Sequence, residues 1–354
     1  MQRKFGKAIT FAVLLPLMCV TVSYSAPVAK RVAAHTAKAE GALDTSVDTE
    51  SRDVTVQLRS LEQEVYITQQ YLYLLLFRQQ FAGRITADRV NIANVDGGGT
   101  PAYVFAPAVL EKNRQYPGLV IVHGSYHGSL DPSIFELIAT AVDKGYIVIF
   151  PEYRGSRGYG QAHYDAIDFG GKEVDDVEAA ADYLAQTRPV PRDRIGIYGR
   201  SKGGMVTLLA IERFPKSFKA AVDVVGLTDM IAYMAYKPGF RGEDVAKQPR
   251  FGGKTIQQDA APYIDVSPLN HVDAIETPLL IHATTGDKTA PVQLHSGRLI
   301  EVLKAHGKGF ESKIYDMAPG GHLYSEVDTP QARDSEQRIF EFLAKYLQPT
   351  PPTP

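Results

Sequence analysis

Short apolar runs alternate with amphipathic stretches between residues 88 and 348. Two of the runs, 118–122 and 146–150, are apolar on both faces, which is typical of central strands in a parallel sheet that helices cover. The amphipathic stretches have the spacing of helices. The pattern predicts strands at 90–92, 103–105, 118–122, 146–150, 194–198, 219–225, 278–282 and 312–317, and helices at 132–144, 172–186, 202–214, 292–306 and 332–347. This order predicts an α/β fold, with a doubly wound, mostly parallel sheet and helices on both faces.

The first two strands flank Asp96-Gly97-Gly98-Gly99, a turn sequence that predicts an antiparallel hairpin. Before them, residues 54–87 form a predicted helical extension, because apolar side chains recur there at spacings of mostly three or four. These side chains are Val54, Leu58, Leu61, Val65, Leu72, Leu75 and Leu76. We expect this face to pack on the following domain, and dimerisation through the helix is the alternative.

The first 25 residues have the pattern of a secretory signal peptide. A basic head precedes an apolar run from Ala8 to Val22, and Ser23 and Ser25 supply small residues for cleavage after Ser25. A membrane anchor is the alternative, but the run is shorter than the roughly 20 residues that span a bilayer. We therefore expect export, with a disordered linker at 26–53 and a Pro-rich tail at 349–354.

Composition limits the class of partner. The 354 residues are 44% apolar, which suffices for one large domain or two small ones. The formal net charge of −2 gives no reason to expect nucleic acid or an anionic membrane, because both select basic patches. We expect a small substrate, no stable membrane association, and no cofactor or metal.

The segment Gly199-Arg200-Ser201-Lys202-Gly203-Gly204 lies directly after a predicted strand and directly before a predicted helix. That context is typical of a nucleophile elbow, in which flanking glycines let the strand and the helix approach each other. Ser201 is therefore the candidate nucleophile. The turn also directs a helix N-terminus at the developing oxyanion, with the backbone N–H of Lys202 as a donor.

A serine hydroxyl needs a base that takes its proton. His322 is the candidate, because Ala318 to His322 follow the last predicted strand, where a loop can present the imidazole. By contrast, His35 falls in the predicted linker, and His295 and His306 fall on a predicted helix.

The acid that orients the base should stand between Ser201 and His322 in the chain. Asp287 fits best, because it follows the strand that ends at His282. We expect structural roles for the other candidates, since two precede that strand and the third lies in or beside the next one. These are Asp265, Asp273 and Asp316.

The loop after strand 118–122 should supply the second oxyanion donor, most simply the backbone N–H of Ser125. A metal pair formed by His123 and His127 is the alternative in this loop. Glycines on both sides argue against the helix that would align two such ligands. We expect no metal here.

Two features bear on substrate recognition. The side chain of Lys202 could point toward the margin of the site and attract an anionic substrate, or it could pair with a local acid. The segment 227–262 is rich in Met, Tyr and Phe and could form a small cap with an apolar pocket, or it could be ordinary core. Candidate substrate-binding residues are Tyr126, Tyr233 and Tyr236.

Together these motifs resemble the catalytic domain of the prolyl oligopeptidase family of serine peptidases, over about residues 88–347. The segments that carry the resemblance are His123-Gly124-Ser125, Tyr153 to Gly160, Gly171 to Val177, Asp193 to Gly204, Ser267 to Asn270 and Thr277 to His282. The resemblance implies an α/β-hydrolase fold. It also implies hydrolysis of peptide or arylamide bonds through an acyl-Ser201 intermediate.

The sequence departs from the family pattern at three points. Only about 60 residues of the mature chain precede the domain, in place of a large β-propeller, so a propeller-borne size filter is not expected. Lys202 stands where Tyr, Asn or His is more usual, and Ala283 replaces a glycine. An ester hydrolase with the same triad is the alternative, because an alkoxide leaves without the full protonation that an amine needs. A binding module without turnover is a further alternative, which the intact Ser, Asp and His disfavour.

Overall fold

The computed structural model describes residues 47–236 and 245–351, and the described chain from Gln57 onward forms one compact unit. The predicted signal peptide and the predicted linker up to residue 46 lie outside the described residues. In the described part of the chain, none of the helices combines the length and hydrophobicity needed to cross a bilayer.

Eight strands form one sheet in the order β1-β2-β4-β3-β5-β6-β7-β8. β1 and β2 make the predicted antiparallel hairpin, β2 pairs antiparallel with β4, and the remaining pairs are parallel. The strands are β1 (Ile85–Ala93), β2 (Gly99–Pro107), β3 (Gly118–Val122), β4 (Ile147–Pro151), β5 (Ile195–Arg200), β6 (Ala220–Val224), β7 (Leu279–Thr284) and β8 (Phe310–Tyr315). The predicted mostly parallel sheet is confirmed.

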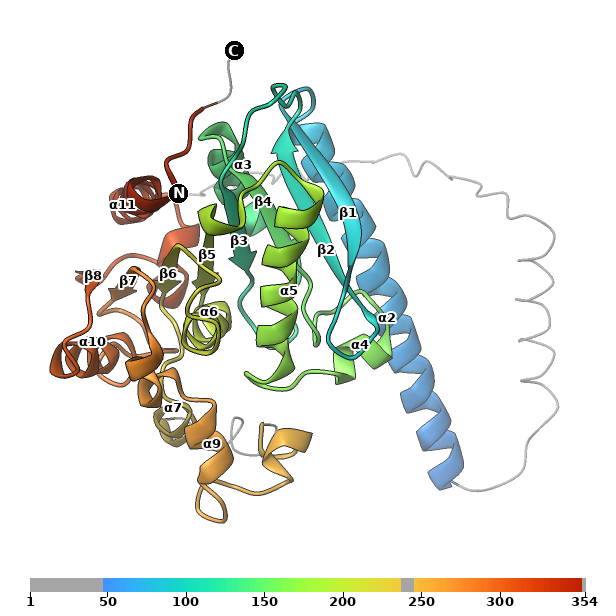
Figure 1. Ribbon diagram of the computed structural model, residues 1–354. Helices are drawn as coiled ribbons and strands as arrows, with labels where there is room; N and C mark the ends of the chain where they lie inside the picture. Colours follow the sequence, from blue (N-terminus) through green and yellow to red (C-terminus); the bar gives the residue numbers. More distant parts are fainter. Residues whose placement is uncertain (1–46, 237–244, 352–354) are drawn as a thin grey trace, which may run out of the picture. The chain divides into compact units, whose positions relative to one another are not determined.

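Helices cover both faces of this sheet (Figure 1). One hydrophobic cluster joins the sheet to α5 (Lys172–Thr187), α6 (Lys202–Arg213) and α10 (Ser296–Ala305). A second cluster joins it to α3 (Phe135–Asp143), α11 (Pro330–Leu347) and the end of α2 (Val47–Gln80). Side chains of a strand alternate between its faces, so Val120 and Val122 of β3 enter the first cluster, and Leu119 and Ile121 enter the second. A strand that supplies two cores must be apolar throughout, which explains the pattern in the sequence.

The remaining helical elements are short. They are η1 (Pro132–Ile134), α4 (Gln161–Asp165), η2 (Arg192–Arg194), α7 (Met230–Tyr236), η3 (Pro249–Phe251), α9 (Ala261–Asp265), η4 (Pro268–Asn270), η5 (Val272–Ala274) and η6 (Gly321–Glu326). Of these, α7 and α9 lie beyond the carboxyl ends of the parallel strands, where the cap was predicted (Figure 1). Met230, Met234 and Phe251 are buried in the first cluster, so this segment extends the core. Phe240, also part of the predicted cap, lies outside the described residues.

α2 packs on the domain through a different face from the predicted one. Leu74, Phe77 and Phe81 are buried, and the Phe77 ring lies 4.6 Å from Phe105 and 5.1 Å from Phe135 between ring centroids. The seven side chains that were predicted to pack are 48–62% exposed. The prediction of the packing face is therefore wrong, because both faces of the helix are apolar and the aromatic side chains occupy the contact. The helix also begins at Val47, seven residues before the predicted start.

Candidate active site

Ser201 stands between the end of β5 and the start of α6, with φ 58° and ψ −122°. A non-glycine residue adopts such a conformation only where its surroundings enforce it. Here the strand and the helix are in close contact, because a Cβ on Gly199 would lie 2.1 Å from the Gly203 carbonyl oxygen. A Cβ on Gly203 would lie 2.2 Å from the carbonyl oxygen of Val122. The turn therefore requires glycine at both positions and holds the Ser201 side chain at the carboxyl edge of the sheet.

Three side chains from separate loops form one hydrogen-bonded chain. His322 Nε2 lies 2.8 Å from Ser201 Oγ, and His322 Nδ1 lies 2.7 Å from Asp287 Oδ2. A carboxylate can only accept, so Nδ1 carries the proton and Nε2 accepts from the Ser201 hydroxyl. The structure thus brings together all three side chains that the sequence selected, in an arrangement that can remove the serine proton.

Backbone donors fix the carboxylate of Asp287. Its Oδ1 accepts from the N–H groups of Thr289 at 2.7 Å and Ala290 at 2.8 Å, which leaves Oδ2 for His322. Asp287 itself is only 5% exposed. The loop that follows β7 therefore orients the acid toward the imidazole.

The other candidate acids have other partners. Asp316 accepts from the Thr285 hydroxyl at 2.8 Å, Asp273 pairs with His306 at 2.7 Å, and exposed Asp265 lies 3.8 Å from the Arg250 guanidinium. These contacts fit the structural roles that were expected for them.

The loop after β3 passes directly beside the elbow. A Cβ on Gly124 would lie 3.0 Å from the Arg200 carbonyl oxygen, and Ser125 has φ 65°. The backbone at Gly124, directly before Ser125, thus lies close to the turn that carries Ser201 and Lys202. The N–H groups of Ser125 and Lys202 remain the predicted oxyanion donors.

Tyr153 and Ser156 hold this loop in place. The Tyr153 hydroxyl donates to the His123 carbonyl at 3.0 Å, and the two rings stack with centroids 4.0 Å apart. His123 Nε2 and Ser156 Oγ are hydrogen-bonded at 2.8 Å. Burial lowers the pKa of His123 to about 3, so its ring is neutral at ordinary pH. His123 therefore serves as a packing and hydrogen-bonding residue.

His127 is engaged in a separate contact, because its Nδ1 donates to the Gly155 carbonyl at 2.7 Å and its ring stacks on Tyr164. Within the ranges that the structure describes, no group of three or more His, Cys, Asp or Glu side chains is arranged to hold a metal ion.

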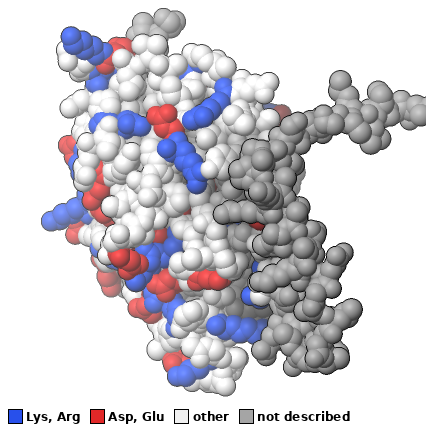
Figure 2. Space-filling model, turned by 90° about the vertical axis from the view of Figure 1, so that its right-hand side faces the viewer, with Lys and Arg blue, Asp and Glu red and all other residues white. Residues whose placement is uncertain are grey.

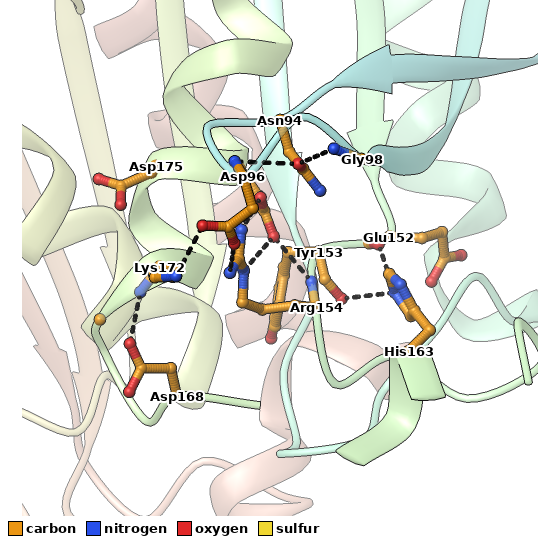
Figure 3. A network of polar contacts seen from close by, with 12 residues as sticks. Asn94, Asp96, Gly98, Glu152, Tyr153, Arg154, His163, Asp168, Lys172 and Asp175 are labelled. Atoms are coloured by element: carbon orange, nitrogen blue, oxygen red, sulfur yellow. Dashed lines mark hydrogen bonds and ion pairs between the residues drawn. The ribbon is translucent and has the colours of Figure 1, made fainter. Parts of the chain in front are cut away.

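A polar network anchors Tyr153 from outside the site (Figure 3). The Arg154 guanidinium pairs with buried Asp176 at 2.8 Å and with Asp96 at 2.7 Å, and Lys172 Nζ lies 2.6 Å from Asp96. Because Asp96 belongs to the hairpin turn and Asp176 to α5, the network ties two separate segments to the residue after Tyr153. The Asp96 pKa is lowered mainly by its hydrogen bond from Lys172, as expected for a paired carboxylate.

The sequence pattern of the prolyl oligopeptidase family matches residues 132–350, a range that contains Ser201, Asp287 and His322. The chain belongs to the prolyl oligopeptidase family. This is a family of serine peptidases, and its catalytic domain has the α/β-hydrolase fold that the sheet and helices described above form.

Known proteins of the same family resemble this member at low identity. The chain is 29% identical over 250 residues to the uncharacterized peptidase YuxL of Bacillus subtilis, covering 70% of this chain and 37% of the relative. It is 24% identical over 245 residues to the acylamino-acid-releasing enzyme of Sus scrofa, covering 64% of this chain and 31% of that relative. This family member thus spans about a third of the length of the curated relatives that it matches.

Solved structures show the same fold. A puromycin-hydrolyzing peptidase of Mycobacterium tuberculosis superposes with a TM-score of 0.63 at 25% identity, over 75% of this chain and 40% of that one. The acylaminoacyl peptidase of Pyrococcus horikoshii superposes with a TM-score of 0.65 at 23% identity, over 79% of this chain and 44% of that one.

In this family member, the Lys202 side chain does not reach the margin of the site. Its Nζ lies 3.2 Å from Glu173 Oε1, and both residues are buried, at 1% and 0% exposed. The ammonium group also lies 5.6 Å from the centre of the Phe169 ring and 5.9 Å from that of Tyr126. Pairing with a local acid is confirmed, and the alternative of a marginal charge that attracts anionic substrates is wrong.

The three candidate substrate-binding tyrosines have different surroundings. Tyr126 is half-buried beside Phe169, with ring centroids 4.7 Å apart, and its ring centre lies 5.9 Å from the Lys202 ammonium group. Tyr233 is buried in the core, and Tyr236 is 40% exposed at the end of α7.

Sequence reasoning missed one residue that contacts the catalytic loop. The Arg200 guanidinium pairs with Glu326 and donates to the His322 carbonyl at 3.4 Å. A signal was present, because Glu326 follows His322 by four residues and a charged residue directly precedes the candidate nucleophile. The pairing itself joins segments that are far apart in the chain.

Proposed function

We propose that this protein is a serine hydrolase that cleaves a peptide or arylamide bond through an acyl-Ser201 intermediate. The observation that carries the proposal is the continuous hydrogen-bonded chain from Ser201 Oγ through His322 to Asp287. Membership of a peptidase family supports the amide bond as the target.

In the first half-reaction, Ser201 Oγ attacks the carbonyl carbon while His322 Nε2 takes the hydroxyl proton. Asp287 stabilises the imidazolium that results and keeps the ring in the tautomer that can act as a base. The carbonyl oxygen becomes an oxyanion, and we assign its stabilisation to the N–H groups of Lys202 and Ser125. His322 then gives its proton to the leaving amine, and the acyl group stays on Ser201.

In the second half-reaction, a water molecule replaces the amine. His322 removes one water proton as the oxygen attacks the acyl carbon, and it returns that proton to Ser201 Oγ as the carboxylic acid leaves. The serine is regenerated, so each turnover consumes one water and one amide.

Two of the predicted tyrosines are suited to contact the substrate. Tyr126 belongs to the loop that passes the elbow at Gly124, and Tyr236 is exposed on α7 near the carboxyl ends of the strands. Tyr233 is buried, so we assign it to the core instead. Tyr126→Ala is expected to raise KM more than it lowers kcat, because it removes contact area without touching the reacting atoms.

The test of the proposed reaction is a pairwise screen of aminoacyl p-nitroanilides against p-nitrophenyl esters with the same acyl group. Hydrolysis of both, lost in Ser201→Ala and retained in the exposed control Ser133→Ala, supports the proposal. Hydrolysis of the esters alone would support an ester hydrolase in place of a peptidase. If neither the anilide nor the ester is hydrolysed with any acyl group, a binding module is favoured.

Export is a separate proposal that rests on residues 1–25 alone. Mass spectrometry of material from outside the cytoplasm should find a mature chain that begins at Ala26. An exported chain with an intact Met1 would contradict cleavage.

A further inference from the structure

One face of α2 carries an apolar stripe, interrupted at Thr68, that nothing in the described chain covers. The α2 stripe consists of Leu58, Leu61, Val65, Leu72, Leu75 and Leu76. These side chains are between 48% and 62% exposed. Isolated exposed leucines are ordinary, but a row of this kind marks an interaction surface.

The spacing of the stripe is that of a coiled-coil seam. Leu58, Leu61, Val65, Thr68, Leu72 and Leu75 follow one another at steps of three, four, three, four and three. Alternating steps of three and four generate the a and d positions of a heptad, which face a partner helix. A helix that lies on a broad surface would instead need a wider apolar face.

The domain does not obstruct this seam. Gln63, Gln70 and Phe77, at intervals of seven, are buried, and Phe77 packs among the aromatic rings of the domain. In a heptad these three occupy the position opposite the a and d seam. The buried contact of α2 and the α2 stripe therefore lie on opposite sides of the helix, so a second helix can approach without displacing the domain.

We propose that the occupant of the α2 stripe is α2 of a second copy of this chain, paired as a two-stranded coiled coil. With each side chain about half exposed, the stripe offers roughly 600 Å² per copy, which reaches the lower limit of about 1,200 Å² in total for a stable interface. The polar flanks are compatible with self-pairing. In a parallel pair, Glu62 would face Gln57 and Glu64 would face Gln69 of the second copy, so no like charges meet.

Charge argues for a protein partner over a lipid surface. Glu62 and Glu64 flank the stripe, and interfacial helices that bind anionic bilayers carry Lys and Arg at such positions. On the face drawn in Figure 2, basic and acidic side chains of the described residues are interspersed. The described part of that face therefore carries no strong field of one sign.

Sedimentation equilibrium of the purified full chain tests this proposal. We expect a monomer–dimer equilibrium with a Kd of roughly micromolar, as a small interface implies. Leu61→Glu should weaken the dimer at least 100-fold, because a carboxylate would be buried in the seam. Ser60→Glu is the matched control, since it adds the same charge one position away from the seam, at an exposed residue, and should leave the Kd unchanged within a factor of about three.

Both substitutions lie on the solvent-exposed side of α2, so circular dichroism and turnover of a p-nitrophenyl ester should be unchanged in either variant. A wild-type chain that stays monomeric up to about 100 times the expected Kd would overturn the proposal. So would a dimer that Leu61→Glu leaves intact, or one that Ser60→Glu weakens equally. None of these outcomes depends on whether the enzyme cleaves amides or esters.

Discussion

Arg200, the residue before the candidate nucleophile, forms an ion pair with Glu326, which follows the candidate base His322 by four residues on η6. Arg200 also donates to the His322 carbonyl at 3.4 Å. The nucleophile and the base come from loops that are distant in sequence, and this arginine connects the two loops. Its contact with His322 is to the backbone carbonyl and not to the imidazole, so it acts as a positioning residue.

Arg200→Met should lower kcat by about tenfold to a hundredfold with little change in KM, because small misplacements of a catalytic group are costly. Arg200→Lys should recover part of the loss, since it keeps the charge opposite Glu326. Steady-state kinetics on one ester measures both effects. Arg338→Met, which breaks the exposed pair with Asp334, is the control and should retain full activity. Equal kcat values for Arg200→Met and the control would show that the pair positions nothing.

Lys202 and Glu173 should stabilise the fold as a pair. Lys202→Met keeps the backbone N–H but leaves the Glu173 carboxylate buried without its cation, so the free energy of unfolding should fall by about 3–5 kcal/mol. Adding Glu173→Gln removes the unpaired charge and should recover most of that loss. Urea unfolding measures the three proteins. A double variant that is no more stable than Lys202→Met would reject this account of the pair.

Glu152 should make stability depend on pH. It is fully buried, and Oε1 accepts from the Leu130 N–H at 2.8 Å. Burial raises the pKa of Glu152 from 4.5 to about 8. The folded-state pKa of Glu152 lies above its unfolded value. Its contribution to the free energy of unfolding is therefore fully present below about pH 4.5 and is lost as the pH rises toward about 8. The loss is at most about 1.4 kcal/mol per pH unit.

Burial also raises the pKa of Asp223 to about 7, so this residue too makes the free energy of unfolding fall as the pH rises. Glu152→Gln keeps an acceptor for Leu130 and cannot ionise. Thermal unfolding between pH 5 and pH 8 should therefore show a smaller fall in Tm for the variant than for the wild type. Parallel profiles would mean that Glu152 does not titrate in this range.

Asp287→Asn should leave the fold intact and lower kcat by about 10⁴, because the amide favours the wrong tautomer of His322. Its Oδ1 contacts with Thr289 and Ala290 can persist, so circular dichroism should not change. A loss below tenfold would point to another acid as the partner of His322, with Asp316 the first to examine.

The sequence predicted the sheet and the three hydrogen-bonded side chains well for a shared reason. Strands buried on both faces are apolar throughout, and residues that directly follow such strands meet at one edge of a parallel sheet. Ser201 and Asp287 follow the buried strands β5 and β7, and His322 comes after the exposed edge strand β8, so all three lie beyond the carboxyl ends of neighbouring parallel strands.

Other features depended on contacts that no local pattern encodes. α2 is apolar on two faces, and only the fit of Phe77 among the rings of the domain decides which face packs. The position of the Lys202 side chain depends on Glu173, which belongs to the start of a different helix. The pairing of Arg200 with Glu326 likewise needs the loops to be placed first.

Labelling with a fluorophosphonate probe tests the central claim most directly, because such probes react with a serine whose hydroxyl is activated by a base. The account predicts that the probe modifies the wild-type chain at Ser201 alone, as mapped by peptide mass spectrometry, and that Ser201→Ala abolishes the label. It also predicts that His322→Ala, which removes the base and leaves the serine in place, nearly abolishes it. Labelling that persists in Ser201→Ala, or that is undiminished in His322→Ala, would contradict the assignment of Ser201 as a nucleophile activated by His322.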